Sequence, residues 1–205
     1  MTKPGYLFIG VDMHDEDVMR RYVDGTTPIL LKHGCEFIAL DDNADLLDGE
    51  YRRQRLVLLR FPSLDAVRAF WDDPDYKPMK ELRKDASETD VLRVEGFGES
   101  QPDQAGEDGE KPVFLVGRSQ VRNPEAMKPY LEFVPPISAR YGAQVLVANP
   151  DYEVLEGSWP AGTFITLRFP SEKAFRGFWS DPDYLPYKQL REDNSEGMHL
   201  MVRGV

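Results

Sequence analysis

The chain consists of two copies of one building block, and this duplication limits what it can fold into more than any other feature. The phrase "FWDDPDYKPMKELR" begins at Phe70, and "FWSDPDYLPYKQLR" begins 108 positions later, at Phe178. With that shift, residues 4–97 align with residues 112–205 without a gap, and 32 of the 94 aligned positions are identical. Repetition over a fixed distance is the signature of a duplicated structural element. We therefore predict two repeats that share one fold, residues 4–97 and 112–205.

The segment between the repeats, residues 98–111, reads "GESQPDQAGEDGEK" and is rich in glycine and acidic residues. It has almost no apolar side chains with which to form a core, and such a composition favours a solvated chain. We predict an acidic, flexible linker that is long enough to let the second repeat pack against the first.

The composition argues against several classes of partner. The formal net charge of the 205 residues is −11, whereas nucleic acids and anionic membranes attract basic surfaces. No apolar run approaches the roughly 18–20 residues that cross a bilayer, and the first residues lack the pattern of a secretory signal. The single cysteine, Cys35, excludes an internal disulfide and is typical of a reducing compartment. We predict a cytoplasmic protein that binds a small molecule and neither nucleic acid nor membrane.

Each repeat contains four segments with the character of strands. In the first repeat these segments are 6–12, 35–41, 55–61 and 91–97, and equivalent segments occur in the second repeat. They are rich in Val, Leu, Ile and Phe, as expected of buried strands. A helix is predicted between the first two strands, and two short helical segments between the last two. The order β-α-β-β-α-β is that of ferredoxin-like folds.

Polar residues and prolines mark where the helices begin and end. Asp15 and Asn123 precede the first helix of each repeat as N-caps, and Ser63 and Ser171 precede the second. Each first helix also contains proline, at Pro28 in the first repeat, which predicts a kink or a break.

The repeated phrase turns the chain between two helical segments at its Asp-Pro-Asp. Trp71 and Tyr76 flank that turn in the first repeat, and Trp179 and Tyr184 flank it in the second. Aromatic side chains at helical spacing usually pack in a core, and we favour that interpretation. The alternative is that these side chains line a ligand site.

The string "RFPSLDAVRAFWDDPDYKPMKELRKDASETDVLRVEGF", residues 60–97, resembles the family of domains of unknown function numbered 1330. The FPS motif, the (S/D)PxY motif and the terminal VEG carry the resemblance, which extends over both repeats. The second repeat departs from it at its end, "MVRGV". The resemblance implies the dimeric α/β-barrel superfamily, whose members include cofactor-free monooxygenases, lactone isomerases, polyketide cyclases and haem enzymes. The family has no settled activity, so no catalytic residue is implied by it.

We therefore predict an α+β fold in which two ferredoxin-like repeats form an intramolecular barrel of the dimeric α/β type. The chain would be a monomer that acts as its own pseudo-dimer, with higher oligomers left open. Alternation along the strands supports this fold, because side chains of one parity are apolar and those of the other are mixed. We assign the apolar parity, with Ala39, Leu92 and Val94, to the helix side. The side chains of the mixed parity are too apolar for a face in open water and too charged for a dry interface, because an unpaired buried charge is costly. A partly polar interior between two joined sheets fits both observations.

Arg60 and Arg168 occupy equivalent positions on the mixed face. Their guanidinium groups are suited to hold an anionic or carbonyl oxygen of a ligand. The alternative, which we favour, is that they form internal ion pairs with carboxylates such as Glu36, Glu95 or Asp12.

His199 is assigned to the mixed face of the last strand and is the imidazole best placed to act as a general base. Its counterpart is Val91, so a site that uses it would exist in one repeat only. Most lone histidines are packed rather than catalytic. The catalytic candidates are His199, Arg60, Arg168, Asp12 and Tyr6. The ligand-binding candidates are Arg118, Gln144, Glu36, Trp71, Tyr76, Trp179 and Tyr184.

The sequence contains no H-x-x-x-H, no C-x-x-C and no glycine-rich phosphate loop, so we predict no metal and no cofactor. The predicted function is that of a cofactor-free enzyme that acts on a small hydrophobic or aromatic metabolite. Its chemistry would be proton transfer of the isomerase or cyclase type in a barrel pocket. One alternative is a non-catalytic small-molecule-binding or stress-associated protein. Another is a monooxygenase-like or haem-using enzyme, which ranks last because only His14 and His199 are candidate haem ligands.

Overall fold

The computed structural model describes residues 2–98 and 109–205. The predicted linker, 98–111, therefore lies outside the described residues at positions 99–108. The elements of the first repeat are β1 (Gly5–Met13), α1 (Glu16–Lys32), β2 (Glu36–Asp41), β3 (Asp45–Asp48), β4 (Arg55–Phe61), α2 (Leu64–Trp71), α3 (Tyr76–Lys84) and β5 (Ser87–Glu95). Those of the second repeat are β6 (Val113–Val121), α4 (Lys128–Ala139), β7 (Gln144–Asn149), β8 (Glu153–Glu156), β9 (Thr163–Phe169), α5 (Glu172–Trp179), α6 (Leu185–Asn194) and β10 (Ser195–Arg203).

The predicted fold class is confirmed: the chain is α+β and is built from two ferredoxin-like repeats. Each repeat also has a short strand, β3 or β8, in addition to the four that were predicted. The chain forms two compact units, and each unit has one antiparallel five-stranded sheet. Unit 1 has the strand order β2-β4-β1-β5-β8, and unit 2 has the order β3-β10-β6-β9-β7.

The two repeats exchange their short strands. β8, from the second repeat, pairs with β5 in unit 1, and β3, from the first repeat, pairs with β10 in unit 2. Unit 1 therefore contains residues 2–43, 52–98 and 151–160, and unit 2 contains 44–51, 109–150 and 161–205. An edge strand with unpaired backbone groups is a liability, and in both units the exchanged strand covers one edge.

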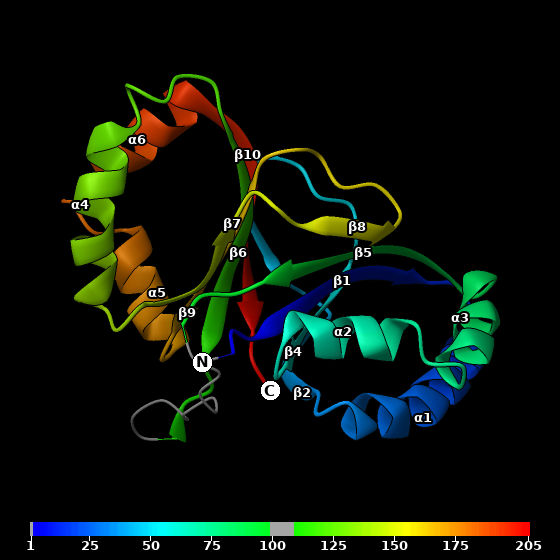
Figure 1. Ribbon diagram of the computed structural model, residues 1–205. Helices are drawn as coiled ribbons and strands as arrows, with labels where there is room; N and C mark the ends of the chain where they lie inside the picture. The colour runs from blue at the N-terminus through cyan, green and yellow to red at the C-terminus, as the bar shows by residue number, and fades with distance from the viewer. Residues whose placement is uncertain (1, 99–108) are drawn as a thin grey trace. The chain divides into compact units, whose positions relative to one another are not determined.

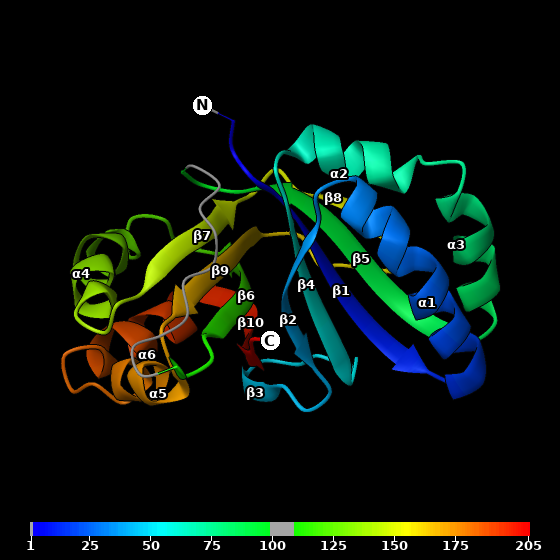
Figure 2. The ribbon, with the colours of Figure 1, turned by 90° about the horizontal axis from the view of Figure 1, so that it is seen from below.

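In unit 1, the helices α1, α2 and α3 cover one face of the sheet (Figure 1 and Figure 2). The core between them and the sheet is apolar and aromatic. The Phe70 ring packs 4.4 Å from the Tyr76 ring and 5.7 Å from the Phe61 ring, measured between centroids, and both pairs are tilted. Unit 2 repeats this core with Phe169, Phe178 and Tyr184 at the equivalent positions. These contacts support the prediction that the aromatic residues of the repeated phrase pack.

Three of the four predicted N-caps begin their helices as expected. The side chains of Asp15, Ser63 and Ser171 each accept a hydrogen bond from a backbone N–H in the first helical turn. Asn123 accepts from the Ala126 N–H, but this closes a turn, and the helix α4 begins only at Lys128. Of the kink or break predicted at proline, the break does not occur, because α1 continues through Pro28 to Lys32.

The first aspartate of the repeated Asp-Pro-Asp connects the turn to the C-terminal end of the first helix in the same unit. The buried Asp73 carboxylate binds Lys32 Nζ at 2.9 Å and His33 Nε2 at 2.7 Å, and it accepts from the Asp75 N–H. The hydrogen bonds from His33 and Lys32 keep the pKa of Asp73 well below its usual range. Asp181 does the same in unit 2, with different partners. The phrase is repeated because the same turn is needed twice.

The assignment of strand faces from parity is wrong for the last strand of each repeat. Val91 lies in the helix-side core of unit 1, whereas Leu92 is in register with Phe8 on the opposite face. Val91 and Leu92 are both almost completely buried, so the more apolar parity does not indicate which face the helices cover. In β2, a register shift between Phe37 and Ala39 puts Ala39 on the face away from the helices.

His199 is affected by the same error. It lies two residues before Met201, which is in register with Leu115 and belongs to the helix-side core of unit 2. Residues two apart in a strand share a face, so His199 faces the helices and not the predicted mixed interior.

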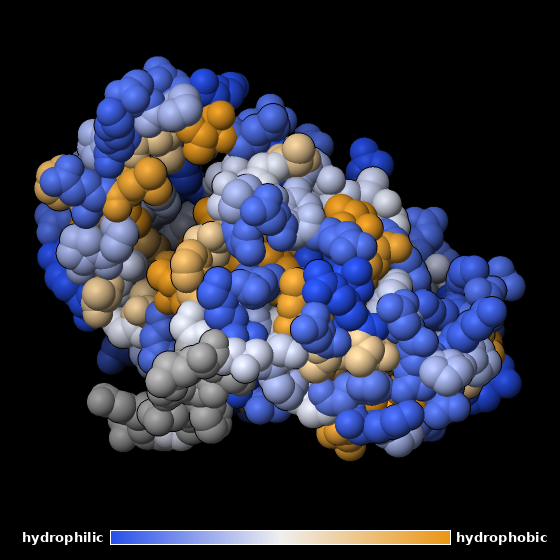
Figure 3. Space-filling model, viewed as in Figure 1, coloured by the Kyte–Doolittle hydropathy of each residue, from blue (hydrophilic) through white to orange (hydrophobic). Residues whose placement is uncertain are grey.

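The surface seen in Figure 3 is mostly hydrophilic, in keeping with the net charge of −11. Some apolar side chains are exposed on α4 and α6, among them Leu131, Phe133 and Leu185. In residues 2–98 and 109–205, no helix is long and apolar enough to cross a membrane.

Candidate functional site

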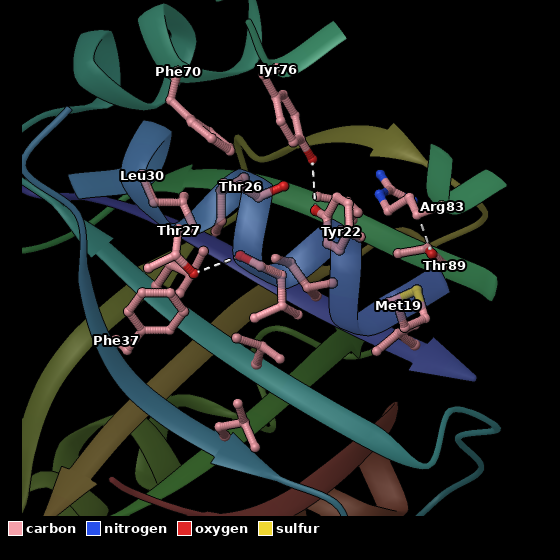
Figure 4. Close-up of a pocket in the computed structure, with 18 of the residues that line it drawn as sticks. Met19, Tyr22, Thr26, Thr27, Leu30, Phe37, Phe70, Tyr76, Arg83 and Thr89 are labelled. Atoms are coloured by element: carbon pink, nitrogen blue, oxygen red, sulfur yellow. Dashed lines mark hydrogen bonds between the residues drawn. The ribbon is translucent and has the colours of Figure 1, made fainter. Parts of the chain in front are cut away.

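Unit 1 encloses an apolar cavity of about 110 Å³ between its sheet and the helices α1, α2 and α3 (Figure 4). The sheet supplies the floor, through apolar side chains that include Leu7, Ile9 and Val57. Val23 on α1 and Leu40 on β2 also line the cavity and are about half exposed, so they form its rim. An apolar cavity of roughly 150 Å³ in another protein binds benzene, so the somewhat smaller space in unit 1, which is open at its rim, is of the size of a single aromatic ring.

Two tyrosine hydroxyls meet at the wall of this cavity. Tyr22 on α1 and Tyr76 at the start of α3 are 3.1 Å apart between their hydroxyl oxygens. Figure 4 shows the pair joined across the top of the cavity. Burial raises the pKa of Tyr76 well above its usual value, and the neighbouring Tyr22 adds to that effect. Tyr76 is therefore protonated at neutral pH and is a hydrogen-bond donor rather than a base.

Arg83 is a buried cation beside this pair. Its guanidinium lies over the Tyr22 ring at 5.6 Å, and it donates to Thr89 Oγ1 at 3.0 Å and to Glu156 Oε2 at 2.5 Å. Glu156 comes from the exchanged strand β8, so the second repeat neutralises an arginine of the first. Arg83 is 4 % exposed, and a buried cation of this kind requires such a partner.

Unit 2 has polar residues of the same kinds at the equivalent positions. Tyr130, Tyr184 and Arg191 replace Tyr22, Tyr76 and Arg83, and Asp48 from β3 replaces Glu156. Asp48 accepts from Arg191 Nη2 at 2.6 Å and lies 2.7 Å from His199 Nδ1.

His199 is held on both ring nitrogens. Arg191 Nη1 lies 2.8 Å from Nε2, and Ser119 Oγ lies 3.4 Å from the same atom. Burial lowers the pKa of His199, and its hydrogen bond to Asp48 only partly offsets this. An open pocket of about 250 Å³ lies beside the ring and is lined by Asp48, Arg191 and Glu196 among others. Because both nitrogens are engaged, we favour a packing role for His199 over the predicted role as a base.

Arg60 and Arg168, considered as a ligand clamp or as members of internal ion pairs, are buried, at 5 % exposure each. Arg60 donates to Glu36 Oε2 at 2.5 Å, which is the ion pair favoured from the sequence. Arg60 and Glu36 are directly opposite each other in the ladder of β4 and β2. Arg168 is opposite Gln144 in the same way in unit 2. Neither arginine lines the cavity of unit 1.

The remaining candidates are dispersed. Asp12 binds Arg53 Nη1 at 3.1 Å and accepts from the Gln54 N–H, and Tyr6 is buried on the sheet face away from the helices. Arg118 donates to the backbone oxygen of Glu196, and Gln144 is exposed. Trp179 and Tyr184 pack in unit 2. Of the twelve predicted site residues, the structure brings Trp71 and Tyr76 together at the unit 1 cavity.

Three polar residues that line the cavity, Tyr22, Thr26 and Arg83, are not among the predicted site residues. A signal for two of them was present, since Tyr22 is identical to Tyr130 and Arg83 to Arg191 in the aligned repeats. Polar residues kept in both copies at positions that become buried point to a shared internal role. Glu156 could not be found in this way, because its contact with Arg83 depends on the exchange of strands.

Comparison with family models assigns the chain. The model of the "Domain of unknown function (DUF1330)" matches residues 4–97 and again residues 112–205. The protein belongs to the DUF1330 family, as a tandem duplication of its domain. No curated protein matches the sequence.

Solved structures share the fold at low identity. A protein from Fusobacterium nucleatum described as a putative monooxygenase superposes with a TM-score of 0.59 at 12% identity, covering 99% of this chain and 93% of that one. A protein described as anthrone oxidase-like gives 0.56 at 10% identity, with 100% and 92% coverage. A chlorite dismutase from Candidatus Nitrospira defluvii gives 0.58 at 9% identity, with 100% and 92% coverage. At these identities the likeness of this DUF1330 protein extends to the fold alone.

Proposed function

We propose that this DUF1330 protein is an enzyme that binds a small hydrophobic or aromatic metabolite in the cavity of unit 1. The observation that carries the proposal is the enclosed apolar cavity with the Tyr22–Tyr76 hydroxyl pair in its wall. An apolar pocket with a few convergent polar groups is the usual form of a small-molecule site. Trp71 and Tyr76, predicted as ligand-binding residues, line it.

The chemistry that this lining supports is stabilisation of an oxygen that gains negative charge. One hydroxyl of the Tyr22–Tyr76 pair donates to the other, so the pair keeps one O–H that can donate to a ligand, close to the Arg83 guanidinium. Donors placed in this way lower the free energy of an enolate or phenolate. The described lining residues include no carboxylate, so the proton would pass to water. Such proton transfer is the core of the isomerase and cyclase reactions predicted from the sequence.

A monooxygenase-like reaction on the same ligand is the second candidate. An enolate or phenolate held by the tyrosines is an electron-rich carbanion equivalent, which is the form of an aromatic metabolite that reacts with dioxygen. The anthrone oxidase-like protein that shares the fold makes this candidate worth testing by oxygen consumption. The haem alternative is not supported by the histidines. His199 has both ring nitrogens engaged, and His14 is exposed and 4.0 Å from Glu88.

Exchange of α-protons of acetophenone, an enolisable single-ring ketone, tests the proposal. The exchange is followed by proton NMR in D2O with the full-length protein. We expect the protein to accelerate it, and Tyr76→Phe to lose about 10²-fold of that acceleration, the usual cost of one oxyanion donor.

Tyr184→Phe is the matched control, because Tyr184 is the buried counterpart of Tyr76 in unit 2 and has its own tyrosine partner, Tyr130. It should leave the exchange rate unchanged. Binding of acetophenone without exchange would support the non-catalytic alternative. Failure of acetophenone to bind, or equal losses in both variants, would contradict a site in unit 1.

A further inference from the structure

One polar atom in the cavity of unit 1 has no hydrogen-bond partner. Thr26 lines the cavity and is 3 % exposed, and its Oγ1 atom is buried without a partner among the described residues. Leaving a buried hydroxyl unsatisfied costs roughly 1–3 kcal/mol, so such a group calls for an explanation.

The neighbouring Thr27 shows that a threonine hydroxyl in this helix need not lack a hydrogen-bond partner. A threonine in a helix can satisfy its hydroxyl by donating to the carbonyl four residues earlier. Thr27 does so, with Oγ1 2.8 Å from the Val23 oxygen, and Figure 4 shows this bond. Thr26 makes no such bond, and its hydroxyl is drawn on the cavity side of α1, with Tyr22 one turn earlier on the same face.

In the second repeat, the position equivalent to Thr26 is occupied by a side chain of the same shape that has no hydroxyl. Thr26 aligns with Val134, which has the same branched shape and is 6 % exposed in the core of unit 2. The hydroxyl is therefore specific to unit 1, where Thr26 lines the apolar cavity.

The charges around the cavity indicate a ligand that enters in its neutral form, before any charge develops on its oxygen. Its two cationic lining residues are already paired, Arg83 with Glu156 and Arg55 with Asp42. An anionic group in the apolar part of the cavity would have no free counter-charge, and burying an unpaired charge is costly.

We propose that Thr26 Oγ1 is the polar anchor of the ligand. The site would then select neutral single-ring aromatic molecules that carry a hydroxyl or carbonyl oxygen over hydrocarbons of the same shape. This inference rests on the proposed function, since it names the class of molecule that occupies the proposed site. Thr26 is a specificity-determining residue in this scheme, and the tyrosine pair is the reactive part of the wall.

The test compares two probes of nearly equal shape, 4-fluorophenol and 4-fluorotoluene, by fluorine NMR titration of the full-length protein. The measured quantity is the ratio of their affinities, because phenols and hydrocarbons differ in hydration outside the protein. We expect Thr26→Val to reduce the preference for 4-fluorophenol roughly tenfold, the equivalent of one net hydrogen bond, while 4-fluorotoluene binds as before. Thr26→Ser should keep the preference.

Thr27→Val is the matched control, since the Thr27 hydroxyl is used within the helix. It should leave the ratio unchanged. If both probes bind and the ratio is the same in Thr26→Val as in the natural protein, the role of Thr26 is overturned while the unit 1 site stands. If neither probe binds, the site and the anchor fail together.

Discussion

At the scale of single residues, the structure brings together groups that are far apart in the sequence. His199 and Asp48 are 151 positions apart and lie 2.7 Å from each other in unit 2. Burial by itself would raise the pKa of Asp48, but the hydrogen bond from His199 and the charge of Arg191 lower it to about 2. Burial lowers the pKa of His199. The pair is therefore a neutral imidazole beside a carboxylate.

This pair predicts how stability changes with pH. The unfolded chain takes up a proton on His199 near pH 6.5, whereas the folded protein resists it, so the free energy of unfolding decreases as the pH falls below that value. Urea unfolding at pH 7 and pH 5 measures this. His199→Val, which copies Val91 of the first repeat, should lose less stability between the two pH values than the natural protein. Equal losses would show that His199 does not titrate as described.

At the scale of elements, the exchanged strands depend on glycines that follow them. Gly157 comes directly after β8 and has a φ of 72°, a left-handed conformation that favours glycine. A Cβ at this position would lie 2.6 Å from the backbone oxygen of Thr89 on β5, the strand with which β8 pairs. Gly49 is in the same situation after β3 in unit 2, with a φ of 75°. Close approach of the backbones, and not only the turn, requires glycine here.

Gly157→Ala should therefore destabilise unit 1 by more than the ~1 kcal/mol of a left-handed alanine, because the added methyl group also displaces β8 from β5. Gly98→Ala is the control, since Gly98 has a φ of 70° but no described atom within 4 Å of the point that a Cβ would occupy. Thermal unfolding of both variants separates the two effects. If both variants lost the same small amount of thermal stability, the contact between the added methyl group and β5 would not be destabilising, and the prediction would be wrong.

At the scale of the whole molecule, neither repeat completes a unit by itself. Each sheet has four strands from one repeat and one from the other. In each unit one buried arginine, Arg83 or Arg191, forms an ion pair with a carboxylate of the exchanged strand. We therefore expect the duplicated sequence to unfold as one cooperative protein rather than as two independent domains joined by a linker.

A cut in the linker tests this dependence. With a protease site inserted in 98–111, the two fragments should stay together after cleavage, because each would otherwise lose an edge strand and leave a buried arginine unpaired. Size-exclusion chromatography of the cut protein should give a single peak at the size of the intact chain. Separate elution of the fragments in native buffer would contradict the role of the exchanged strands.

The duplication, the order of the main strands and helices, and the caps at Asp15, Ser63 and Ser171 follow from the sequence alone. They rest on local signals, namely identity at a fixed shift, apolar runs and capping chemistry, which do not depend on distant partners. Tertiary structure alone decided which strand completes each sheet, which face of β5 and β10 meets the helices, and which carboxylates pair with Arg83 and Arg191. The first and last of these are contacts between residues 60 or more positions apart, which no local period encodes. The faces were hidden because both sides of these strands are buried. The cavity of unit 1 has the same origin, since it is the space left where helices and sheet meet, and only the packed side chains define it.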